Sequence, residues 1–295
     1  MNILNMEHIS KIYGDKVIFD DISVGIHQGD KIGLIGINGT GKTTFLRILA
    51  GTEEPDQGQV IMQNGLRISC LSQHPEFPEG ATILSYVTAG KQEQDWNPET
   101  DAHMILNKLG IVDHEEEIAH LSGGQKKRVA LARVLINPAD VLILDEPTNH
   151  LDIESIQWLE NFLSTRANAV VLVSHDRAFL NNVTTRTIEI TCGRIYDYKV
   201  KYDEFVVLRK ERREQQLRAY ENQQKQIQDT EDFIERFRYK ATKAVQVQSR
   251  IKQLEKIERI EVDEEDNSSL RLKFVCSSRS GNYPVICEDM EEILR

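Results

Sequence analysis

The chain has 295 residues, 40% of them hydrophobic and 28% charged, which is typical of a soluble globular protein with one large or two modest domains. No stretch approaches the ~20 apolar residues of a transmembrane helix, and the N-terminus lacks the basic flank and cleavage site of a signal peptide. The four cysteines are scattered and form no metal-binding pair. We therefore expect a cytoplasmic protein with reduced thiols and no membrane partner.

The net charge of −11 is unevenly distributed. Residues 1–198 carry 16 basic and 27 acidic side chains, residues 199–260 carry 16 and 11, and residues 261–295 carry 4 and 9. A basic segment on an acidic body can attract a polyanion locally, which a uniformly acidic protein cannot do. The overall charge therefore does not exclude a nucleic-acid partner.

The first 120 residues combine strand patterns with a helical region. Alternating apolar and polar residues separated by glycines predict strands at 2–8, 17–26 and 31–35. Helical spacing predicts a helix over 43–49 and a small helical subdomain over 75–120.

The next 80 or so residues have the pattern of a parallel sheet with crossover helices. An amphipathic helix is predicted over 125–135, ending at Asn137-Pro138. Continuous apolar runs at 141–144 and 169–173 predict parallel strands buried on both faces, with a crossover helix over 153–163 between them. Together these elements predict an α/β domain over residues 1–198, with a parallel sheet core, an antiparallel β part and a helical subdomain.

Residues 199–262 differ in character, because glycine and proline are absent and charged residues and glutamine dominate. Apolar residues recur at helical spacing in two runs, namely Tyr202, Val206, Leu217, Tyr220 and Ile227, then Ala244, Val247, Ile251, Leu254 and Ile257. This pattern predicts an antiparallel helical hairpin. The apolar seam is thin around Arg209 and Arg213, so we expect a mobile arm.

The segment 36–43 reads Gly-Ile-Asn-Gly-Thr-Gly-Lys-Thr and satisfies G-x-x-x-x-G-K-[ST] between a predicted strand and a predicted helix. Glycines let backbone N–H groups turn towards phosphates, and the helix N-terminus adds its dipole. Lys42 would neutralise phosphate charge, and the Thr43 hydroxyl would ligate Mg²⁺. We predict ATP and Mg²⁺ as ligands, with ATP contacts from Gly36, Asn38, Gly39, Gly41, Lys42, Thr43 and Thr44. A plain glycine turn is the alternative for the motif alone.

Two adjacent carboxylates follow the apolar run 141–144. Asp145 would hold Mg²⁺, and Glu146 is placed to polarise an attacking water. An acidic pair at a strand end is common by itself. Because a phosphate loop lies about a hundred residues earlier, we predict an ATPase in which Glu146 is catalytic.

The segment Leu121-Ser122-Gly123-Gly124-Gln125 begins a predicted helix, for which Ser122 could serve as the N-cap. This pentapeptide resembles the signature of the ATP-binding-cassette (ABC) ATPases, and the resemblance extends over residues 1–198. It implies the ABC-type fold of the P-loop NTPases and adds four functional residues. These are Tyr13 stacking on adenine, Gln73 sensing Mg²⁺ and the γ-phosphate, His175 as a catalytic switch, and Asp152 communicating across a dimer.

In this family ATP lies between the phosphate loop of one cassette and the signature of another. The resemblance therefore implies that Ser122, Gly123, Gly124 and Gln125 act in trans. We expect full ATPase activity to need a second cassette, either in a longer chain or in a second copy of this one. The acidic stretch 263–269 predicts a linker, and residues 274–295 resemble the opening of such a cassette, so we expect a truncated two-cassette protein.

The turn 149–152, Asn-His-Leu-Asp, and the hairpin that follows His175 resemble the F subfamily, whose studied members act on ribosomes. The resemblance implies a translation factor with ribosomal RNA and tRNA as partners. Residues 236–256 hold seven basic residues and one acidic residue, and basic side chains beside aromatic ones suit phosphate pairing and base stacking. We predict RNA contacts from Arg236, Arg238, Tyr239, Lys240, Lys243 and Arg250; a solvated coiled-coil face is the alternative.

Two other functions are compatible with an ABC cassette. The ATPase subunit of a membrane transporter would have a hydrophobic partner groove and no basic hairpin, so the cluster at 236–256 counts against it. A DNA-associated ATPase would insert its coil before Asp145, whereas the predicted helices follow His175. The hairpin itself could still bind DNA.

Overall fold

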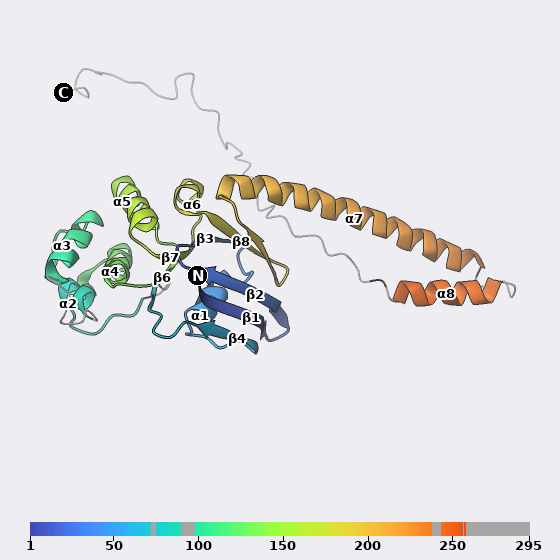
Figure 1. The fold of residues 1–295 in the computed structure, drawn as a ribbon, viewed down its shortest axis with the longest axis horizontal. Helices are drawn as coiled ribbons and strands as arrows, with labels where there is room; N and C mark the ends of the chain where they lie inside the picture. The colour runs from blue at the N-terminus through green and yellow to red at the C-terminus, as the bar shows by residue number, and fades with distance from the viewer. Residues whose placement is uncertain (72–74, 90–97, 238–242, 256, 258–295) are drawn as a thin grey trace, which may run out of the picture. The chain divides into compact units, whose positions relative to one another are not determined.

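The computed structural model describes residues 1–71, 75–89, 98–237, 243–255 and 257 (Figure 1). Contacts group residues 1–264 into one compact unit. The expected acidic linker and second-cassette opening, at 263–295, lie outside the described residues. In the described part of the chain, no helix combines the length and apolar character needed to cross a membrane.

A six-stranded sheet forms the centre of the fold and brings three strand ends together. Its order is β5-β6-β7-β3-β8-β9, parallel except for β9. The bounds are β3 Lys31–Ile35, β5 Ile68–Leu71, β6 Val141–Asp145, β7 Ala169–Val173, β8 Arg186–Thr191 and β9 Arg194–Tyr198. Because β7 lies between β6 and β3, the carboxyl ends of these strands meet at one edge, where open α/β sheets bind ligands.

A separate antiparallel sheet of order β2-β1-β4 confirms the predicted antiparallel part. Its strands are β1 Asn2–Tyr13, β2 Lys16–His27 and β4 Gln57–Met62. Tyr13 pairs with Lys16 at the tight turn between β1 and β2.

Helices α1 to α6 precede the arm in the chain. Their bounds are α1 Lys42–Leu49, α2 Ile83–Thr88, α3 Pro98–Lys108, α4 Gly123–Ile136, α5 Ile153–Thr165 and α6 Arg177–Val183, with a 3-10 turn at Ile118–His120. Helices α2 and α3 lie in the predicted helical subdomain at 75–120, and they share one apolar cluster with α4, which was predicted separately over 125–135 (Figure 1).

Alternate side chains of β6 point into two different cores, which explains why its sequence is continuously apolar. Val141 and Ile143 join the core with α1 and the antiparallel sheet, whereas Leu142 and Leu144 join the core with α2 to α6. Burying each such side chain contributes roughly 1.5–3 kcal/mol. A strand covered on both faces needs no polar alternation.

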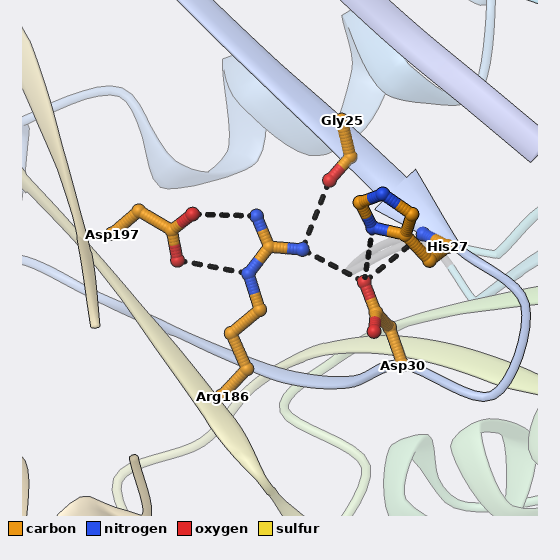
Figure 2. A network of polar contacts seen from close by, with 5 residues as sticks. All are labelled: Gly25, His27, Asp30, Arg186 and Asp197. Atoms are coloured by element: carbon orange, nitrogen blue, oxygen red, sulfur yellow. Dashed lines mark hydrogen bonds and ion pairs between the residues drawn. The ribbon is translucent and has the colours of Figure 1, made fainter. Parts of the chain in front are cut away.

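A buried arginine joins the two sheets (Figure 2). The guanidinium of Arg186 donates to both oxygens of Asp197 at 2.8 and 2.7 Å, and also to Asp30 Oδ2 at 2.7 Å and Gly25 O at 2.9 Å. The bidentate pair with Asp197 raises the pKa of Arg186 despite burial. The β8–β9 hairpin and the end of β2, which lie about 160 residues apart in sequence, thereby share one charge network.

The arm begins at Tyr202, with α7 Tyr202–Phe237 and α8 Ala244–Glu255 packed together as the predicted hairpin. Glu189 of β8, only 1% exposed, forms an ion pair with Arg209, Nε to Oε1 at 2.5 Å, and accepts a hydrogen bond from Arg212 Nη2 at 2.9 Å. The thin part of the apolar seam is therefore the part that ion pairs hold to the central sheet.

Candidate nucleotide site

The phosphate loop, residues 36–41, has a backbone path that excludes side chains at both ends. A Cβ on Gly36 would lie 2.8 Å from Ile190 O. Gly41 has a φ of 101°, and a Cβ there would lie 2.4 Å from Ile18 Cγ2. Glycine is required at these positions by close packing and by the left-handed conformation. A larger residue at either position would therefore displace the loop.

Lys42 begins α1 and folds back over the phosphate loop. Its Nζ donates to Gly36 O at 2.6 Å, to Ile37 O at 3.2 Å and to Asn38 Oδ1 at 3.4 Å. Burial lowers the pKa of Lys42, and the nearby carboxylates of Glu146 and Asp145 oppose that effect. The ammonium is therefore held where a phosphate could replace its carbonyl partners.

Thr43 and Asp145 meet across the strand edge, with Thr43 Oγ1 3.2 Å from Asp145 Oδ2. Burial raises the pKa of Asp145, and the Thr43 hydroxyl opposes this. Among the described residues no group of three His, Cys, Asp or Glu could enclose a metal. The pair nevertheless fits Mg²⁺, because that ion uses one or two protein oxygens together with substrate phosphates and water. Gln73, the other predicted ligand, lies outside the described residues.

Glu146 and His175 face each other beside this pair. Glu146 Oε1 is 3.4 Å from His175 Nε2, and the backbone N–H of His175 donates to Glu146 Oε2 at 3.4 Å. The Glu146 side chain is 10% exposed and that of His175 73%. Glu146 also has a φ of 51°, a left-handed conformation that costs free energy and is concentrated at functional sites. Burial raises the pKa of Glu146, while His175 opposes that rise.

Tyr13 lies at the turn between β1 and β2, beside α1. Its hydroxyl donates to Glu53 and also bonds to the Thr44 side chain, which places the ring next to the helix after the phosphate loop. Tyr13 is 46% exposed, and Lys11 Nζ lies 5.6 Å from its ring centroid. In the same turn, Lys16 Nζ donates to Gly39 O at 3.0 Å.

The signature residues form the start of α4. Ser122 caps the helix, and its backbone and side chain exchange hydrogen bonds with Gln125 in a capping box. A Cβ added at Gly123 would have nothing within 4 Å, whereas a Cβ added at Gly124 would lie 3.2 Å from His150 Cβ. Ser122 and Gly123 are exposed, so the segment can be reached by a partner.

Asp152 caps α5 and remains exposed. Its Oδ1 accepts from Ser155 N at 2.8 Å, and this bond, aided by Arg128, lowers the pKa of Asp152. Because Asp152 is exposed, its carboxylate can be reached from outside the chain.

The predicted RNA-contact residues are only partly described. Arg236 is exposed at the end of α7, Lys243 Nζ donates to Gln246 Oε1 at 3.0 Å, and the Arg250 guanidinium lies 4.1 Å from the Phe233 ring centroid. Arg238, Tyr239 and Lys240 lie outside the described residues.

Sequence reasoning missed three neighbours of the site. Lys16 contacts the phosphate loop, Arg177 lines a hollow with Lys42 and His175, and Ser174 accepts from Asp176 N at 3.1 Å. Arg177 and Ser174 flank His175 in sequence, so their position offered a signal. Lys16 offered none, because its contact depends on the β1–β2 turn.

Comparisons with known proteins agree with this geometry. Two family models, both described as ABC transporter, match residues 19–149 and 188–272. The dimeric post-hydrolysis structure of an ATP-binding cassette with ADP and Pi has a TM-score of 0.58 at 23% identity, covering 68% of this chain and 99% of that one. An ATP-binding subunit of an ABC transporter has a TM-score of 0.61 at 21% identity, covering 68% and 91%. The predicted fold class is confirmed.

Several curated proteins are similar in sequence. An uncharacterized ABC transporter ATP-binding protein, YfmR of Bacillus subtilis, is 42% identical, covering 73% of this chain and 40% of its own. The energy-dependent translational throttle protein EttA of Mycobacterium tuberculosis is 30% identical, covering 98% and 58%. The probable ATP-binding protein YheS of Escherichia coli is 35% identical, covering 86% and 45%. The chain spans about half the length of these relatives. It belongs to the ABC ATPase family, and its likeness to EttA and YheS is consistent with the F subfamily.

Proposed function

We propose that this chain binds and hydrolyses MgATP as one cassette of an F-subfamily protein, and that its arm contacts RNA on the ribosome. The observation that carries the ATPase part is the Glu146–His175 pair at 3.4 Å, set beside Thr43 and Asp145 at the edge of the sheet. A buried carboxylate with a raised pKa suits general base catalysis.

Each residue has a distinct part in the proposed reaction. Lys42 exchanges its carbonyl partners for the phosphates and neutralises their charge. Glu146 orients the attacking water and accepts its proton, and His175 holds the Glu146 carboxylate in place. When bound by Thr43 and Asp145, Mg²⁺ supplies neutralisation of charge on the phosphate oxygens. The exposed Ser122 and Gly123 serve the nucleotide of a partner cassette.

The ribosome part rests on the arm. Seven basic residues and one acidic residue lie within 236–256, and Arg250 stacks on Phe233. Arginine beside an aromatic ring can pair with phosphate and stack on a base. The similarity to a protein named a translational throttle supports this partner. The two-helix arm itself argues against the alternative of a transporter subunit.

The test is sedimentation of the chain with purified ribosomes, with and without ATP. Glu146→Gln removes the general base, slows hydrolysis by about 10²–10⁴-fold and preserves ATP binding. We expect ATP to retain this variant on ribosomes, and Arg236→Glu, Lys243→Glu and Arg250→Glu together to abolish retention. Lys210→Glu, Arg218→Glu and Lys225→Glu provide a control of equal charge change on the same arm.

Equal loss in both triple variants would show that only overall charge matters, which contradicts a specific arm contact. ATP-dependent binding to duplex DNA but not to ribosomes would favour the DNA-associated alternative. If the chain hydrolysed ATP but bound neither ribosomes nor duplex DNA, the ATPase proposal would stand and the proposal of a ribosomal partner would be wrong.

A further inference from the structure

Two histidines of the helical subdomain face each other through ring nitrogens. His103 lies on α3 and His114 in the segment that follows it, and both are half-buried. Their ring centroids are 4.6 Å apart, and Nδ1 of one ring contacts Nδ1 of the other. Two nitrogens of the kind that bind transition metals are therefore presented to each other by different elements.

A reversal of the chain after α3 brings these rings together. Gly110 has a φ of 70°, and the N–H of Ile111 donates back to Leu106 O at 3.0 Å. This is the left-handed helix end that glycine favours. The segment after Ile111 returns to α3, where His114 meets His103.

The backbone at both histidines is held in place. On α3, Ala102 and Ile105 are buried in the apolar cluster on either side of His103. The carbonyl of His114 accepts from the N–H of Leu84 in α2 at 2.9 Å. A binding pair that is supported in this way keeps its geometry without the ligand.

The second nitrogen of His114 fixes the state of its ring. His114 Nε2 is 2.9 Å from the carbonyl oxygen of Ile111, which can only accept, so Nε2 carries the proton and Nδ1 of the neutral ring has a lone pair. Metal-binding histidines show this arrangement, in which the other ring N–H donates to a backbone carbonyl. His103 Nδ1 meets the lone pair either with its own proton or, when that proton is on Nε2, across a shared cation.

We propose that His103 and His114 bind a divalent transition-metal ion of the Zn²⁺ type through their Nδ1 atoms. Imidazole suits zinc, copper and nickel, whereas Mg²⁺ and Ca²⁺ prefer oxygen. Two Zn–N bonds of about 2.0–2.1 Å in tetrahedral geometry place the nitrogens about 3.3 Å apart, so the rings turn slightly away from each other on binding.

The rest of the coordination comes from water. Within the described ranges, no third His, Cys, Asp or Glu joins the pair to enclose an ion. The bound ion links α3 to the segment that leads through the turn Ile118–His120 to Ser122 of the signature. Because the ion binds the folded subdomain, it stabilises the native chain by mass action.

The test is isothermal titration calorimetry of Zn²⁺ into the metal-free chain, with Mg²⁺ in excess to occupy oxygen sites. Thiolates compete for zinc, so the parent for this experiment carries serine at all four cysteines, namely Cys70, Cys192, Cys276 and Cys287. We expect one Zn²⁺ per chain at the pair, and a rise in the thermal midpoint as Zn²⁺ is added.

Three single variants of this parent locate the ion. We expect His103→Gln and His114→Gln each to weaken Zn²⁺ binding by more than about tenfold, because even partners that only support a metal ligand contribute 10–100-fold. The exposed His120, in the same subdomain but outside the pair, provides the matched control, and His120→Gln is expected to leave the affinity unchanged. Thermal unfolding in chelator shows whether each variant folds before metal is added.

A parent that takes up no Zn²⁺ at about 0.1 mM would overturn the inference and leave a pair joined only by a hydrogen bond. Equal affinity in the parent and in either pair variant would also overturn it, because both rings are required. A loss in His120→Gln as large as in the pair variants would place the ion elsewhere. None of these outcomes bears on the proposed ATPase function.

Discussion

At the scale of single residues, two glycines at helix starts differ in what surrounds them. A Cβ on Gly41 would lie 2.4 Å from Ile18 Cγ2 at a φ of 101°, whereas Gly123 has open space. We expect Gly41→Ala to lower the free energy of unfolding by about 2–4 kcal/mol through backbone strain and overpacking. Gly123→Ala is expected to change it by less than about 0.5 kcal/mol. Urea unfolding followed by circular dichroism measures both, and equal effects would contradict the close packing of the phosphate loop.

The pKa of Glu146 gives the proposed hydrolysis a pH dependence. Burial raises this pKa above its usual 4.5, and a carboxylate accepts a proton from water only when ionised. We expect kcat/KM for ATP to fall as the pH drops through a value above that of an ordinary glutamate. Because His175 lowers the pKa of Glu146, we expect the decrease in kcat/KM at low pH to begin at a higher pH in the His175→Gln variant. Steady-state rates across pH measure the shift.

ATP affinity measured over the same pH range serves as the control for that profile. If kcat/KM decreased at the same pH in the parent and in the His175→Gln variant, the two side chains would not be electrostatically coupled. If kcat/KM of the parent decreased only at the pH where an exposed glutamate is protonated, Glu146 would not be the group that titrates.

The sequence predicted those site residues whose chemistry depends on local spacing. The phosphate loop and the Asp145-Glu146 pair are contiguous motifs, so their geometry follows from one strand and one turn. The contact of Lys16 with Gly39 O and the hollow lined by Lys42, His175 and Arg177 could not be predicted in this way. Both depend on contacts between segments that are distant in sequence, and the spacing of residues within one segment does not predict such contacts.

At the scale of elements, β8 is a strand whose burial could not be predicted from local spacing. Its sequence, Arg-Thr-Ile-Glu-Ile-Thr, has the polar alternation of an exposed strand, yet all six residues are buried. Arg186 is compensated by Asp30 and Asp197, and Glu189 by arginines of α7. Strands β6 and β7 were predictable because apolar contacts alone account for their burial. A strand that depends on remote charges is not predictable from its own residues.

The compensation of Glu189 leads to a stability prediction. Replacing Arg209 and Arg212 by methionine leaves a carboxylate that is 1% exposed without a cation. We expect a loss of about 3–5 kcal/mol in the free energy of unfolding, because the buried charge remains. Adding Glu189→Gln removes that charge, so we expect the triple variant to regain most of the lost free energy of unfolding. Urea unfolding midpoints compare the three chains.

Methionine is the chosen replacement because its apolar body retains packing against Tyr196, over which Arg212 lies at 3.7 Å. A triple variant as unstable as the double one would show that packing, and not the buried charge, ties α7 to the sheet.

At the scale of the whole molecule, the exposure of Ser122 and Gly123 leaves the signature accessible to the second cassette that we propose completes the ATP site. Lys42→Ala removes the phosphate-loop lysine but leaves the signature intact. Gly123→Arg blocks the signature for a partner and, with open space around Gly123, leaves the chain's own fold unchanged. We expect each variant alone to be inactive as an ATPase.

Mixing these two inactive variants should restore hydrolysis if copies of the chain pair. In an equal mixture, half of the two-fold pairs contain one copy of each variant. Each such mixed pair has one intact ATP site out of two. We therefore expect about a quarter of the parent's ATPase activity. Phosphate production in the mixture measures it. A mixture of Lys42→Ala with Glu146→Gln is the control, because both defects lie in the same half of the site and every pair remains inactive. Restoration in the control as well, or in neither mixture, would contradict a signature that acts in trans within such pairs.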